Sequence, residues 1–262
     1  MAAENVHDFN RTDQAAEGEE PEGGTMTLIE HLEELRGRLI KVAIAVAACS
    51  VVGFIFWDRI LTFLLLPLPA AANKLPGAAS HTLVASDIGE PFMVALKLAL
   101  AVGIMVASPV LLYQTWAFIA PALTRRERKY ALPFTLLGVG LFAVGLAVGF
   151  VVLRYPIDWL VHFGSDRFVL LTNADSYFTF VAYFLLAFAI VFELPLVLTF
   201  MSVVGIVNST ILRQKRLYIL FGLWFLSCFI TPGADPYSPV IIGVSFTVLF
   251  EGTILLMRAI HR

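Results

Sequence analysis

Two glutamates of this sequence each lie close to arginines, next to the first two long apolar stretches. Glu34 lies in HLEELRGR, residues 31–38, just before the first stretch, and Glu127 is the one acid in the basic segment 119–130. A carboxylate pairs with a planar guanidinium group through two parallel hydrogen bonds, so two separated carboxylates suit a ligand with two adjacent arginines. A solvated helix at the membrane surface also explains the first segment. An exposed ion pair, worth at most about 1 kcal/mol, also explains Glu127.

Two further ionisable residues, Lys97 and Glu193, lie inside apolar stretches. A charge at membrane depth costs from about 2.5 kcal/mol upward and usually faces a helix bundle or a wet cavity. Lys97 is close to the start of its stretch, from which a lysine can extend its ammonium to the membrane surface. Glu193 is about 24 Å along its helix from Tyr177. Pro195 removes a helical hydrogen bond nearby, which predicts a bend with a polar crevice. A protonated glutamic acid, hydrogen-bonded within the bundle, is the alternative.

Six apolar stretches must position these residues. Apolar residues make up 59% of the 262 residues and charged residues 15%, against about 45–50% and about 25% in soluble domains. A backbone in hydrocarbon has to bond internally, so each stretch is predicted to be a helix. We therefore predict an all-α membrane protein with six transmembrane helices, of which the fifth and sixth are short. The predicted spans are about 39–57, 93–118, 131–153, 177–204, 217–231 and 239–257. The short apolar piece 60–66 is predicted to lie at the interface or to cap the bundle.

The distribution of basic residues predicts the orientation of these spans. With the N-terminus in the cytoplasm, thirteen Lys and Arg residues fall on the cytoplasmic side and four on the other. This bias predicts that both termini are cytoplasmic. Residues 1–25 are acidic and Gly-rich without an apolar core, so we expect a disordered cytoplasmic tail rather than a cleaved signal peptide. The transmembrane domain is then 26–262.

The sequence lacks the usual patterns for covalent chemistry. His31 is not part of a zinc-binding HExxH motif, and the two cysteines, Cys49 and Cys228, fit as small core residues. We find no nucleophile–base pair and no Gly-rich phosphate loop. We therefore expect no enzyme activity, no metal, no cofactor and no nucleic-acid partner. The energy for any transport is expected to come from outside this chain, from the proton gradient.

Four motifs, in order along the chain, resemble those of the TatC family, the multi-spanning subunit of the twin-arginine protein translocase. The third and fourth correspond to that family's fourth span and last outer turn. The motifs are His31-x-x-Glu34-Leu35-Arg36-x-Arg38, Gln114-x-Trp116-x-Phe118-x-x-Pro121-x-Leu123 followed by Glu127-Arg128, Phe192-Glu193-x-Pro195, and Thr231-Pro232-x-x-Asp235.

The resemblance implies a binding protein in the bacterial cytoplasmic membrane. Glu34 and Glu127, with Arg36 and Phe118 nearby, would bind twin-arginine signal peptides of folded cargo at the cytoplasmic face. Glu193 would face the interior of a concave bundle. Single-span TatA/TatB-type subunits would join it in a hetero-oligomer with several copies. Three residues are expected in structural roles: Pro121 at the end of the second helix, and Pro67 and Asp235 on the outer side. Trp116 and Phe118, which precede Pro121, are expected to be anchors at the membrane interface.

One alternative stays open from the sequence. Glu193 and Lys97 could serve a proton-coupled secondary transporter. That alternative predicts that neutralising Glu193 stops the flux of a small solute, whereas changes in the cytoplasmic segments have little effect.

Overall fold

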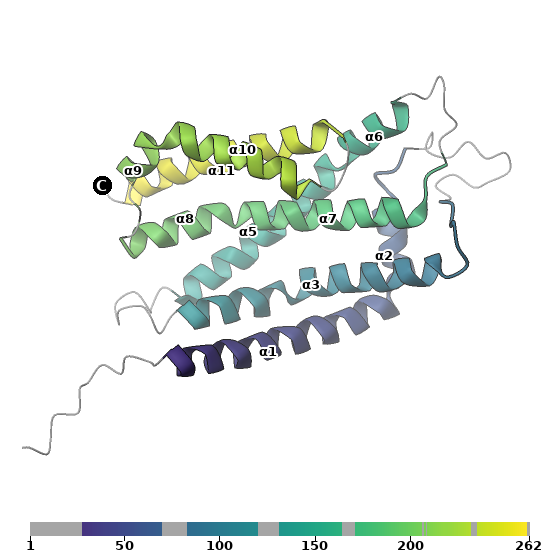
Figure 1. Ribbon diagram of the computed structural model, residues 1–262, viewed down its shortest axis with the longest axis horizontal. Helices are drawn as coiled ribbons and strands as arrows, with labels where there is room; N and C mark the ends of the chain where they lie inside the picture. Colours follow the sequence, from purple (N-terminus) through teal and green to yellow (C-terminus); the bar gives the residue numbers. More distant parts are fainter. Residues whose placement is uncertain are drawn as a thin grey trace, which may run out of the picture. The chain divides into compact units, whose positions relative to one another are not determined.

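The computed structural model describes residues 28–69, 83–119, 131–163, 171–205, 207, 209–231 and 235–260. The chain divides into two compact units, residues 1–37 and 38–262, and the packing below is that of the second. Within the described residues the regular structure is helical, apart from one isolated bridge between Val84 and Asn173. The helices, drawn in Figure 1, are α1 (Leu28–Ile55), α2 (Trp57–Leu64), α3 (Glu90–Ile119), α5 (Ala131–Val152), α6 (Arg154–His162), α7 (Ala174–Phe192), α8 (Leu194–Val203), α9 (Ser209–Gln214), α10 (Arg216–Ile230) and α11 (Tyr237–Ile260).

Five of the predicted spans coincide with helices long and apolar enough to cross a membrane. These are Ile29–Ile55, Glu90–Ile119, Leu132–His162, Ala174–Val203 and Tyr237–Leu255. The fifth predicted span is α10, which has 15 residues and is short as expected. At a rise of 1.5 Å per residue it extends about 22 Å, less than the roughly 30 Å of a hydrocarbon core.

The prediction of a short sixth helix is wrong, because α11 has 24 residues. Pro236 and Pro239 suggested a late start, yet Pro239 lies in the first turn of α11, where an N–H has no partner within the helix and a proline is tolerated. The third stretch also continues further than predicted, through α6 to His162. The short apolar piece forms α2, with eight residues, and is not a candidate span.

Helix α7 is at the centre of the packing. It packs against α3, α5 and α11, and Figure 1 shows the α7–α8 line between α3 and the α10–α11 pair. Four phenylalanines recur along α7 at every fourth position, so they share one face. Consecutive rings lie 5.8, 4.9 and 6.5 Å apart between centroids, and they belong to Phe180, Phe184, Phe188 and Phe192.

Two glycines let α5 approach α7 closely. A Cβ atom on Gly145 would lie 2.8 Å from the carbonyl oxygen of Phe188, and one on Gly149 would lie 2.8 Å from Phe188 Cβ. Both distances are too short for any side chain larger than hydrogen. The four-residue spacing is that of the small-residue motif by which membrane helices pack, since lipid supplies no hydrophobic drive between helices.

Candidate functional site

Arg38, the last residue of the HLEELRGR segment, contacts Gln114, the first residue of the second motif. Arg38, in the first part of α1, donates from Nη1 to Oε1 of Gln114 on α3 over 3.2 Å. The guanidinium and the amide are partly buried, so the bond ties α1 to α3 at the level where α3 approaches its end. Both segments were identified as motifs in the sequence, but the pairing of these two side chains was not predicted.

Trp116 is a packing residue, which corrects its prediction as an interfacial anchor. Its side chain is 6% exposed. Its ring lies 5.2 Å from that of Phe134 on α5 and 4.6 Å, edge-on, from that of Phe200 on α8. The indole packs against two phenylalanines and so holds α3, α5 and α8 together, which is not the role of an anchor at the membrane surface. Phe118, two residues on, is half-buried in the last turn of α3.

The predicted carboxylate site is only partly within the described residues. Glu34 is half-buried on α1 and Arg36 is exposed two residues later. Glu127 and Pro121 lie outside the described residues. The distance between the two predicted carboxylates therefore stays a prediction.

Glu193 lies at a break between two helices, as Pro195 predicted. Helix α7 ends at Phe192 and α8 begins at Leu194, with Glu193 between them. Its amide donates to the carbonyl oxygen of Ile190 over 3.0 Å, a tighter turn than that of an α-helix. Pro195 lies in the first turn of α8, where its missing N–H costs nothing because that N–H would have no partner within the helix.

The Glu193 carboxylate is buried without a partner. Within the part of the chain that the structure describes, neither oxygen has a hydrogen-bond partner. Its surroundings are α5 and α3: a methyl group on Gly138 would lie 3.3 Å from Oε2 and 3.4 Å from Leu112 Cδ1. An unpaired buried carboxyl group costs free energy, which marks the position as a functional candidate.

A cavity lies beside this bend, and its lining is apolar. Six apolar residues and one threonine line the volume of about 390 Å³, and the threonine hydroxyl donates to the carbonyl oxygen of Pro195 over 2.7 Å. The described residues thus give an apolar cavity where the sequence predicted a polar crevice. The lining residues are Pro133, Phe134, Leu137, Leu141, Pro195, Leu196 and Thr199.

Lys97 does not approach Glu193. Its Nζ lies 2.5 Å from Oδ1 of Asp175, in the first turn of α7, and both side chains are substantially exposed. Asp175 precedes Glu193 by 18 residues, about 27 Å along a helix. The two intramembrane charges therefore belong to separate sites.

The start of α7 is held by a polar network that the sequence did not reveal. Asn173 caps the helix by accepting from the amide of Ser176 over 2.9 Å, and its amide group donates to Glu90 Oε1 over 2.7 Å. The same Glu90 oxygen accepts from the Asp175 amide over 3.0 Å. The only sequence signal was the capping residue type before α7.

Asp235 and Pro67 are in structural positions. The carboxylate of Asp235 is buried, accepts from the Ser238 amide over 2.7 Å and from its hydroxyl over 2.8 Å, and so caps the start of α11. Pro67 follows α2 in the turn before buried Leu68. Among the described residues no group of three potential metal ligands occurs.

The family model described as Sec-independent protein translocase protein (TatC) matches residues 30–244. The chain belongs to the TatC family. The TatC proteins of Desulforapulum autotrophicum and Escherichia coli (strain K12) are each 34% identical to it. Their alignments span 86% and 87% of this chain and 82% and 86% of the relatives. A crystal structure of the twin-arginine translocase receptor TatC matches with a TM-score of 0.74 and 31% identity, covering 89% of this chain and all of the other.

Membership of the TatC family assigns the protein to a protein translocase. It is a membrane-embedded core subunit of the Sec-independent, twin-arginine translocase, which works with TatA/TatB-type partners. TatC is a translocase component and not a family of catalytic enzymes.

Proposed function

We propose that this TatC protein binds twin-arginine signal peptides of folded cargo at its cytoplasmic face, with Glu34 and Glu127 as the carboxylates that receive the two arginines. The observation that supports the proposal is the Arg38–Gln114 hydrogen bond, because it pairs the last residue of the motif that contains Glu34 with the first residue of the motif that ends in Glu127 and Arg128. Arg36 orients the two acids, and Phe118 offers an apolar contact beside them. We further propose that Pro121 terminates the second transmembrane helix.

The proposed orientation has six crossings with both termini in the cytoplasm of a bacterial cell. Five candidate spans and the shorter α10 supply the six, and the excess of Lys and Arg on one side supports the direction. In this arrangement the Arg38–Gln114 end is cytoplasmic, and the Asp175 end faces the opposite side. Glu193 is then inside the membrane, facing the interior of a concave bundle.

Single-span partner subunits are proposed to pack on α10. This helix exposes large apolar side chains at every fourth residue, and therefore along one face. They are Leu217, Phe221, Phe225 and Phe229, each more than half exposed. Several copies of this chain and of such partners would make up the complex. A cysteine at Phe221 should cross-link to a single-span partner, in a background without Cys49 and Cys228, whereas a cysteine at exposed Leu96 of α3 should not.

The signal-peptide proposal is tested by export of a twin-arginine reporter. We expect Glu34→Ala and Glu127→Ala each to abolish export while the protein still inserts stably. Cutting back one partner of a desolvated charge pair costs about 2–5 kcal/mol, enough to lower binding by well over tenfold. Glu33→Ala is the matched control, because Glu33 is exposed on the same helix and is not a proposed ligand. Full export by either of the first two variants would refute the assignment.

A photo-crosslinker at Glu127 separates this proposal from the transporter alternative. Contact with a signal peptide supports the translocase receptor. If no signal peptide is cross-linked and Glu193→Gln loses the flux of a small solute, the transporter is favoured.

A further inference from the structure

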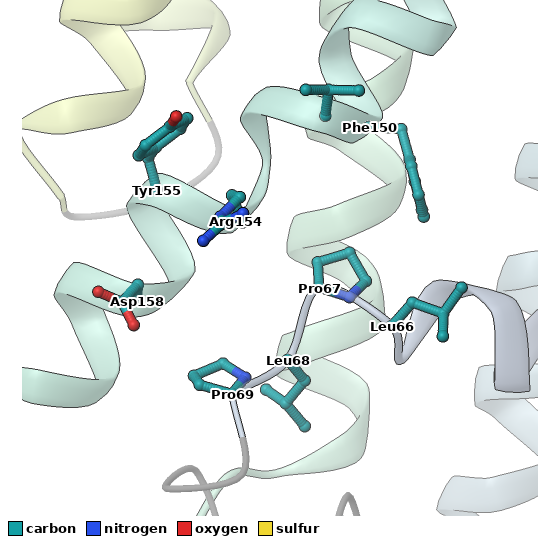
Figure 2. A pocket seen from close by; sticks show the side chains of 9 residues that line it. Leu66, Pro67, Leu68, Pro69, Phe150, Arg154, Tyr155 and Asp158 are labelled. Atoms are coloured by element: carbon teal, nitrogen blue, oxygen red, sulfur yellow. The ribbon is translucent and has the colours of Figure 1, made fainter.

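A cavity of about 570 Å³ lies between the turn after α2 and the junction of α5 and α6. Figure 2 shows the turn that carries Pro67 and Pro69 beside the helical segment that carries Arg154, Tyr155 and Asp158. The cavity is at the C-terminal end of α5, in the second half of the candidate span Leu132–His162. Neither the signal-peptide site nor the bend at Glu193 uses these residues.

The polar side of the cavity presents one positive and one negative group. Arg154 and Asp158 are four residues apart on α6, so their β-carbons are separated by about 5–6 Å. They do not pair with each other: Asp158 lies 3.4 Å from His162 Nδ1, and the Arg154 guanidinium lies 5.8 Å from the centroid of the Tyr155 ring. Among the described residues no carboxylate lies within ion-pair distance of Arg154. The two charges can therefore both face a ligand.

The opposite side of the cavity is apolar. Leu66 and Phe150 line it, and Phe150 stacks on Phe63 with ring centroids 4.5 Å apart. Leu66 and Val151 are about two-thirds exposed, so the apolar side continues onto the outer surface of the helices. The cavity thus joins a surface suited to hydrocarbon to a pair of opposite charges.

We propose that this cavity binds the headgroup of a zwitterionic phospholipid, phosphatidylethanolamine, from the leaflet at that end of the molecule. The lipid phosphate pairs with the Arg154 guanidinium. Its ammonium group, two carbons further on, donates to the Asp158 carboxylate one helical turn away. The acyl chains follow Leu66 and Val151, and Tyr155 occupies the interfacial level that tyrosines favour. The lipid would fasten the turn at Pro67 to α6.

Native mass spectrometry of the purified, full-length protein tests the proposal with defined lipids. We expect phosphatidylethanolamine to bind about fivefold more tightly than phosphatidylcholine, whose quaternary ammonium cannot donate a hydrogen bond. Asp158→Asn should reduce that preference to about one. Arg154→Gln should weaken both lipids. Arg59→Gln and Asp58→Asn on α2 are the matched controls, since Arg59 also stacks on a ring, that of Phe56, but neither lines the cavity. Both should leave lipid binding unchanged.

Three results would overturn the proposal. The first is equal retention of phosphatidylethanolamine by the wild-type protein and both cavity variants, and the second is an equal loss of binding in the α2 controls. The third is displacement of the lipid by glycerophosphoethanolamine, the headgroup without acyl chains, at similar concentration. That result would assign the cavity to a soluble phosphate compound. The elution volume of each variant in size-exclusion chromatography shows whether it is folded, so a loss of binding cannot be mistaken for misfolding.

Discussion

Helix α7 begins in a network of partnered polar groups and ends beside a polar group that has no partner among the described residues. At its start, Asn173 and Asp175 bond to Glu90 and Lys97 of α3 over 2.5–3.0 Å. At its end, the two oxygens of Glu193 are buried beside Gly138 and leucines. The first arrangement positions α7 against α3. The second arrangement lowers the stability of the fold, so we infer that Glu193 has a functional role.

The two ends of α7 show that a charged residue in a membrane helix can have either of two effects on the stability of the fold. A charge at the membrane surface that finds partners contributes to the fold, and removing it weakens the fold. A buried charge without partners opposes folding, and removing it should strengthen the fold while harming activity. Substitutions at the two ends of α7 should therefore change stability in opposite directions.

The largest effect is expected at Glu193. Glu193→Leu should raise the free energy of unfolding by about 3 kcal/mol, because it removes a buried polar group that has no partner among the described residues. Export of a twin-arginine reporter should fall in the same variant. Unfolding in mixed micelles titrated with SDS measures the first quantity. Glu193→Gln is the control: it keeps the shape and the unpaired polar atoms, so its gain should be smaller.

A loss of stability in Glu193→Leu would contradict the comparison. It would mean that the carboxylate has a stabilising partner outside the described residues. The two ends of α7 would then differ in location but not in kind.

A smaller effect, of the opposite sign, is expected at the start of α7. Asn173→Ala should lower the free energy of unfolding by about 2 kcal/mol, since it removes a helix cap worth about 1 kcal/mol and a donor to Glu90. Asn173→Ser keeps a capping oxygen and should recover about half of the loss. If Asn173→Ala and Asn173→Ser proved equally stable, the cap would contribute nothing and the network would depend on Glu90 alone.

The sequence predicted the helices and the bend because both follow from local rules. Long apolar runs have to be helical in a bilayer, and Pro195 cannot continue the hydrogen bonding of α7. Helix α11 is longer than predicted at both ends: it begins at Tyr237, since a proline is acceptable in the first turn of a helix, and it continues to Ile260. The close approach of α5 and α7 depends on Gly145 and Gly149, whose four-residue spacing is visible in the sequence.

The contacts of the candidate sites could not be predicted in the same way. The Arg38–Gln114 and Lys97–Asp175 pairs join residues 76 and 78 positions apart. Pairing at such a distance depends on how helices pack, and one sequence carries no direct record of that. Trp116 shows the same limit: a tryptophan near a helix end suits both a membrane surface and a packed junction, and only the neighbouring rings decide.

The smallest effect is expected for the ion pair at the start of α7. Lys97→Met should cost less than about 1 kcal/mol, because both side chains are exposed and water weakens their attraction. The loss should shrink further at high salt, and Lys97→Arg should show none of it. Export should continue in Lys97→Met, since the lysine is paired far from Glu193. Export abolished by Lys97→Met but retained by Lys97→Arg would instead give the charge itself a role in transport, and the start of α7 would join its bend as a functional site.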